Sequence, residues 1–84
     1  MTDLEFDILD ELYFVTPFDA LHRTLGMDAV ALKEALQSLI DKGWVKCFYS
    51  STVEVVTEKV NFDEEYLHYQ YLATKAGLLA HNSR

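Results

Sequence analysis

Residues 16–45, TPFDALHRTLGMDAVALKEALQSLIDKGWV, decide the fold of this chain. Thr16 is a suitable helix N-cap, Pro17 suits the first helical position, and Asp19 stands three residues after the cap. Apolar residues then follow at helical spacing until Gly26, which can adopt a positive φ and end the helix. The first part of the stretch therefore predicts a short capped helix that ends in a tight glycine turn.

The second part of the stretch predicts a longer amphipathic helix, which Asp28 caps and Gly43 ends. Its apolar stripe consists of Leu32, Ala35, Leu36, Leu39 and Ile40. Its opposite, polar side carries Lys33, Glu34, Gln37 and Asp41. The alternative is a plain αα-hairpin in a small helical bundle. We favour a helix pair that leads into a strand, because Trp44 follows the glycine and begins an aromatic and β-branched run.

The N-terminal segment also predicts a helix. Leu4, Ile8 and Leu12 recur every four residues, and Thr2 or Asp3 can cap the helix at its start. One interpretation of its apolar face is that it packs in a small core. The other is that part of this face meets a second copy of the chain.

Three runs after the helix pair have the composition or the period of strands, and they are residues 44–49, 53–60 and 66–73. Residues 50–52 form a plausible turn, and residues 61–65 are acidic and turn-like. The runs predict either a two-stranded ribbon or a three-stranded antiparallel meander. Thr74 then caps a final short helix, residues 75–81.

The composition fits one domain, residues 1–84, in which half of the residues are hydrophobic. A chain of this length buries about 60–65% of its unfolded surface, so we expect modest stability. No apolar run approaches the ~20 residues that a membrane span needs, and we expect no membrane partner. The single cysteine, Cys47, is expected to be a buried apolar residue, and the absence of an internal disulfide suits a cytoplasmic protein.

Two segments resemble the winged helix-turn-helix domains of small bacterial transcriptional regulators. LGMDAVALKEALQSLIDKGWV, residues 25–45, resembles the turn, the recognition helix and the entry to the wing. YQYLATKAGLLAHN, residues 69–82, resembles the last wing strand and a threonine-capped helix with an internal glycine. With the first helix, the resemblance spans most of residues 3–81. It implies an α+β fold with a three-helix core, a two- or three-stranded antiparallel wing and a short C-terminal helix.

The resemblance further implies binding of double-stranded DNA through the second helix of the pair. On its exposed side, Gln37 would pair with an adenine edge and Val30 would contact a thymine methyl. The phosphate contacts would come from Arg23, Lys33, Lys46 and Lys59. The alternative is an ordinary solvated helix face. Because such regulators normally bind two half-sites as dimers, we expect a homodimer or another protein partner.

The charge of the chain opposes strong DNA binding. The formal net charge is −7, whereas affinity for DNA draws largely on neutralised phosphates. Residues 1–20 hold six acids and no base, residues 21–50 four bases and three acids, and residues 51–84 three bases and five acids. The expected wing, residues 50–65, departs from the family because it carries one lysine and five acids. We therefore predict weak or partner-assisted DNA binding.

The alternative function is an acidic winged-helix module that binds proteins and not DNA. Aromatic residues are 13% of the chain, and both sides of residues 66–71 carry them. We expect some aromatic side chains to be exposed, as at interfaces, from among Tyr49, Phe62, Tyr66, Tyr69 and Tyr71.

We do not expect an enzyme. His22, His68 and His81 lie far apart in the sequence and show no metal-ligand spacing. No glycine-rich phosphate loop is present, and a lone cysteine with scattered histidines makes no catalytic pair. The sequence therefore predicts no catalytic residues, no metal site and no cofactor.

Overall fold

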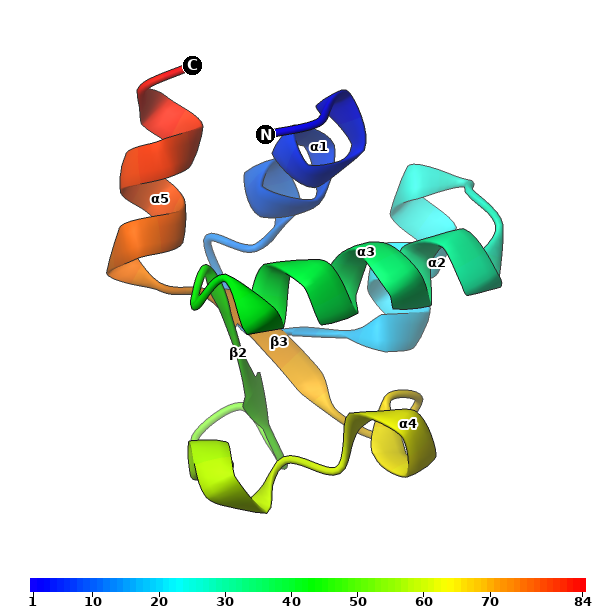
Figure 1. Ribbon diagram of the computed structural model, residues 1–84. Helices are drawn as coiled ribbons and strands as arrows, with labels where there is room; N and C mark the ends of the chain where they lie inside the picture. The colour runs from blue at the N-terminus through cyan, green and yellow to red at the C-terminus, as the bar shows by residue number, and fades with distance from the viewer.

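The computed structural model describes residues 1–84 as helices around a small antiparallel sheet (Figure 1). The elements are α1 (Asp3–Glu11), β1 (Thr16–Pro17), α2 (Phe18–Leu25), α3 (Ala29–Asp41), β2 (Val45–Phe48), the 3₁₀ helix η1 (Thr57–Lys59), α4 (Phe62–Glu65), β3 (Gln70–Ala73) and α5 (Lys75–Asn82). None of the helices has the length and the apolar character that crossing a bilayer requires.

Side-chain caps begin three of the helices where the sequence predicted them. The Thr2 hydroxyl accepts the N–H of Glu5, whose carboxylate accepts the N–H of Thr2, so α1 starts with a capping box. Asp28 caps α3, and Thr74 caps α5, each by accepting the N–H three residues further on. Gly26 ends α2 with a φ of 61°, as predicted.

The predicted cap of α2 is wrong. Thr16 lies in β1 opposite Tyr71 of β3, and its hydroxyl donates to the Phe14 carbonyl oxygen at 2.8 Å. The N-cap residue is Pro17, which offers no side-chain acceptor. Pairing with β3 holds Thr16 in extended backbone one residue too early to cap the helix. A two-residue strand is too short to show a period, so no sequence pattern indicated it.

The sheet has three antiparallel strands in the order β1-β3-β2, with β3 in the centre. In the register of β2 and β3, Val45 lies opposite Ala73 and Cys47 opposite Tyr71. These four side chains are buried, so the sheet presents an apolar face to the helices. The sheet is therefore three-stranded, but its third strand precedes α2 and does not come from residues 53–60.

Residues 53–60 do not form the predicted strand. Glu54 makes a single bridge to Phe48, and the chain then leaves the edge of β2 to form η1 and α4. Val55 and Phe62 turn into the core, where they are 2% and 5% exposed. Their burial overrides the β propensity of the run. Likewise, only the second half of residues 66–73 is a strand.

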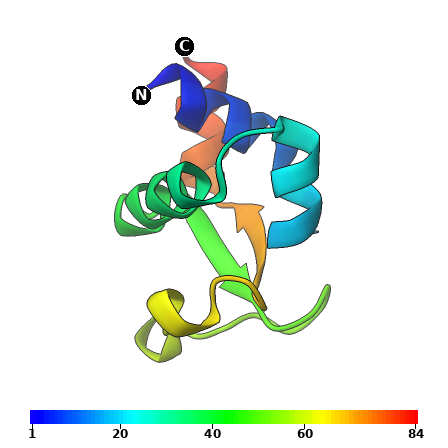
Figure 2. The same cartoon turned by 90° about the vertical axis from the view of Figure 1, so that its right-hand side faces the viewer.

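The core forms where α1, α2 and α3 meet the sheet. Its buried residues are Ile8, Leu9, Leu12, Phe18, Leu21, Leu32, Leu36, Leu39, Val45, Cys47, Val55, Phe62, Tyr69, Tyr71 and Ala73. In both views, α1 and α5 lie on one side of α3, and the segment from η1 to α4 lies on the other (Figures 1 and 2). The apolar stripe of α3 therefore points into the core, as the sequence predicted.

Candidate functional site

The outward face of α3 is the candidate site, because α3 occupies the position of the expected recognition helix. Leu32, Leu36 and Leu39 are fully buried, which fixes the rotation of the helix about its axis. On the other side, the Val30 side chain is 61% exposed and Glu34 is exposed. Helical spacing thus predicted the exposed side of α3 correctly.

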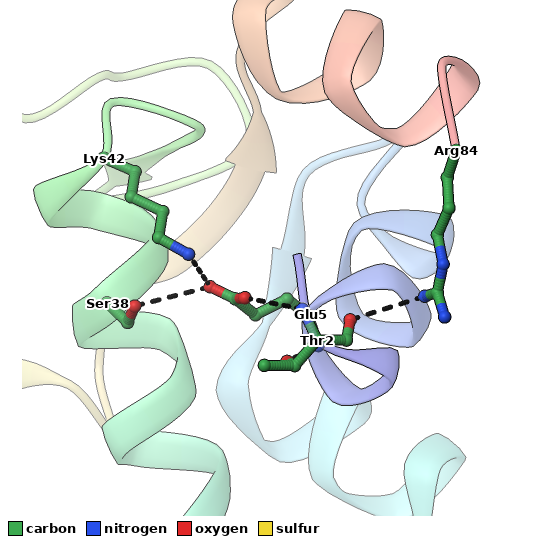
Figure 3. Close-up of polar contacts among 5 residues, drawn as sticks. All are labelled: Thr2, Glu5, Ser38, Lys42 and Arg84. Carbon is green, nitrogen blue, oxygen red and sulfur yellow. Dashed lines mark hydrogen bonds and ion pairs between the residues drawn. The ribbon is translucent and has the colours of Figure 1, made fainter.

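A buried carboxylate holds α3 against α1. Glu5 of α1 is 4% exposed, and one of its oxygens accepts hydrogen bonds from Lys42 Nζ at 2.6 Å and Ser38 Oγ at 3.3 Å (Figure 3). The other oxygen takes the Thr2 N–H of the capping box at 3.0 Å. The Thr2-x-x-Glu5 spacing was a visible signal for the capping box, but no sequence pattern indicates the contact of Glu5 with Ser38 and Lys42.

This contact makes stability depend on pH. Burial alone would raise the pKa of Glu5, but hydrogen bonds from Lys42 and Thr2 and the charge of Lys42 outweigh it and lower the pKa from 4.5 to about 2. A carboxylate whose pKa is depressed in the folded state stabilises that state above its unfolded pKa. The stabilisation is therefore full above about pH 4.5 and is lost as the pH falls toward 2.

We expect Glu5→Gln to lower the free energy of unfolding by about 2 kcal/mol at pH 7. The difference from the unmodified protein should narrow as the pH falls from 4.5 toward 2, because the protonated Glu5 is then neutral as well. Urea unfolding at pH 7, 4 and 2.5 measures it. The control is Asp7→Asn, an exposed position on the same helix. A Glu5→Gln deficit that is equal at all three pH values would contradict the prediction.

The outward face of α3 borders the segment that contains η1 and α4. One cavity of about 290 Å³ is lined by Val30, Lys33, Glu34, Gln37, Phe62 and Asp63. A second, of about 520 Å³, is lined by Gln37, Ile40, Asp41, Thr57, Val60, Asn61, Phe62 and Asp63. Because both cavities share Gln37, Phe62 and Asp63, we treat them as one groove, the α3–α4 groove.

Polar side chains of the groove already have partners. Lys33 Nζ lies 3.5 Å from Asp63 Oδ1 and 4.7 Å from the centre of the Tyr66 ring. Gln37 Nε2 donates to Asp41 Oδ1 at 2.9 Å. The lysine and the glutamine that we nominated for DNA are thus engaged by the protein's own acids.

The structure brings together three of the six nominated DNA-binding residues. Val30, Lys33 and Gln37 line one cavity, whereas Arg23, Lys46 and Lys59 do not line it. Arg23 pairs with Asp19 at 3.6 Å, and Lys46 pairs with Glu54 at 3.2 Å. Lys59, on η1, is exposed and has no acid within 4.0 Å.

The nominated aromatic residues are mostly packed. Tyr49 is 57% exposed, but Phe62, Tyr69 and Tyr71 are buried and Tyr66 is half-buried. The Tyr71 hydroxyl donates to the Tyr66 carbonyl oxygen at 2.6 Å, and burial raises the pKa of Tyr71. Of the five aromatic residues that we nominated, Tyr49 is the exposed one, and it lies just after β2.

Two titratable side chains lie away from this face. Cys47 is 1% exposed, as predicted, and burial raises the pKa of its thiol to about 12. His81 is 8% exposed and stacks on Phe6 at a centroid distance of 4.2 Å. Its Nε2 lies 3.2 Å from Asp10 Oδ1. No group of three or more His, Cys, Asp or Glu side chains is placed to hold a metal ion.

Comparison with known proteins shows a likeness to a solved structure. No protein-family model matches the sequence, and no curated protein matches it. Among solved structures, apo MarR from E. coli superposes with a TM-score of 0.76 and is 19% identical in sequence. The match covers 99% of this chain and 54% of the MarR chain, so this chain spans about half the length of MarR. The chain thus has the winged helix-turn-helix fold of MarR.

Proposed function

We propose that this chain is a non-catalytic, regulator-like winged-helix module that acts by binding another protein and does not bind DNA by itself. The observation that carries the proposal is the surroundings of α3. The acidic segment, residues 61–65, lies along the outward face of α3, and its Asp63 pairs with Lys33. The fold supports a regulator-like role, and the site supports the interaction module over the DNA-binding one.

The charge near α3 favours the protein-interaction module over DNA binding. The outward face of α3 together with α4 carries one base, Lys33, and five acids, so the formal charge of this region is −4. The acids are Glu34, Asp41, Asp63, Glu64 and Glu65. An exposed ion pair is worth only about 0–1 kcal/mol, so DNA could displace Asp63 from Lys33. The remaining acids would still repel phosphates, which carry most of the affinity for DNA.

Partner-assisted DNA binding is the second candidate. Two observations favour it: Val30 is exposed on α3, and Lys59 has no acidic partner. A second protein, or a second copy in a homodimer, would then have to supply the phosphate contacts.

For either function we propose a cytoplasmic protein that works as a homodimer or in a complex. Analytical sedimentation of the protein over a range of concentrations measures its mass in solution. A monomer mass that does not change with concentration would reject the homodimer.

A salt titration with labelled mixed-sequence duplex DNA tests the proposal. We expect no saturable binding even at about 20 mM salt, where phosphate contacts are strongest. Lys33→Ala and Gln37→Ala should leave the anisotropy unchanged. Lys75→Ala is the control, because Lys75 is exposed on α5 away from the groove.

Three results together would overturn the proposal in favour of DNA binding. Duplex DNA would bind saturably, the affinity would fall as salt is raised, and Lys33→Ala and Gln37→Ala would weaken it while Lys75→Ala did not. That pattern would show that α3 enters a groove of DNA despite its acidic surroundings.

A further inference from the structure

We propose that the α3–α4 groove binds an extended, basic segment of a partner protein, in which apolar side chains alternate with lysine or arginine. This inference rests on the proposed function, because it names the surface and the partner chemistry for the same face of α3.

The groove has the length of a short peptide. Its two cavities run along α3 from Val30 to Asp41 and share a wall formed by α4. Eleven helical steps of about 1.5 Å make this distance roughly 16 Å. An extended chain advances about 3.3 Å per residue, so about five residues of a partner fill it. Figure 2 shows α4 below α3.

The lining of the groove combines apolar and acidic side chains. Val30, Ile40, Val60 and Phe62 supply its apolar surface. Phe62 is buried, whereas Val30 is 61% exposed and lacks a cover. Glu34, Asp41 and Asp63 are the acids among the lining residues. A ligand that matches this lining carries apolar side chains between positive ones.

Charge complementarity selects a basic segment over other occupants. Lys33 is the one basic residue among the lining residues, and its partner Asp63 neutralises it. An incoming lysine or arginine can replace Lys33 at little cost, because exposed ion pairs are weak. Duplex DNA is a poor match for the groove, because its phosphates would face an acidic lining. A second copy of this chain is also a poor match, because its net charge is −7 and its seven basic residues stand singly along the sequence.

The test uses a fluorescein-labelled peptide, GKLRLKG, and the full 84-residue chain. We expect saturable binding by anisotropy, and amide shifts in a ¹⁵N spectrum confined to α3 and residues 57–66. Glu34→Lys should weaken binding at least tenfold. The matched control Glu11→Lys makes the same charge change at an exposed position on α1 and should change the affinity less than twofold. The acidic peptide GELELEG should not bind.

Four other outcomes would each overturn the inference. These outcomes are no saturable binding, amide shifts away from the groove, equal weakening by Glu11→Lys and Glu34→Lys, and a dimer that Glu34→Lys dissociates. The DNA titration separates the two proposals. If neither peptide nor duplex binds α3, the groove inference falls and the proposed function stands. If duplex DNA binds saturably and displaces the peptide from α3, the proposed function falls as well.

Discussion

Replacing Gly77 with alanine is expected to lower the free energy of unfolding by about 3 kcal/mol. A Cβ at this position would lie 2.2 Å from the carbonyl oxygen of Trp44, which belongs to the backbone and cannot rotate away. That oxygen also accepts the Thr74 N–H at 2.9 Å, so a shift would disturb the start of α5. Helix propensity alone predicts the opposite sign, a gain of about 1 kcal/mol.

Urea unfolding followed by the fluorescence of Trp44 measures this change. Gly43→Ala is the matched control, since it makes the same substitution where no atom lies within 4 Å of the added Cβ. Its φ of 76° is costly for alanine, so we expect a loss of about 1 kcal/mol. A Gly77→Ala protein that is as stable as the control, or more stable, would contradict the close packing of α5 on Trp44.

Replacing Leu36 with alanine is expected to cost about 3 kcal/mol. The Leu36 side chain is fully buried at the centre of the apolar stripe of α3, so its loss removes buried surface and leaves a cavity. Thermal and urea unfolding both measure the effect. Val30→Ala on the same helix is the control, because Val30 is 61% exposed and its loss should change stability by no more than about 0.5 kcal/mol. Similar costs at both positions would contradict the rotation of α3.

The features that the sequence predicted correctly are local ones. The caps at Asp28 and Thr74 and the glycine that ends α2 depend on residues within one helical turn. The burial of Leu32, Leu36 and Leu39 follows from helical spacing within a single element. The same spacing placed Val30, Lys33 and Gln37 on one surface, which the structure confirms.

The features that the sequence did not reveal depend on distant partners. Glu5 and Lys42 are 37 residues apart, and no pattern within either segment indicates that they meet. Residues 53–60 have β propensity, but they leave the free edge of β2 after the bridge at Glu54, and burial of Val55 decides their path. The acidic segment could be counted in the sequence, but its place along α3 required the tertiary structure.

The contact between Tyr66 and Lys33 tests the central claim most directly, because that claim requires the acidic segment to lie along the outward face of α3. A proton NOE spectrum of the 84-residue chain measures it. With Lys33 Nζ 4.7 Å from the ring centre, we predict cross-peaks between the Tyr66 ring and the Lys33 side-chain methylenes, with those methylenes shifted upfield by the ring. Tyr66 ring protons that show cross-peaks to their own segment and none to α3 would contradict the account.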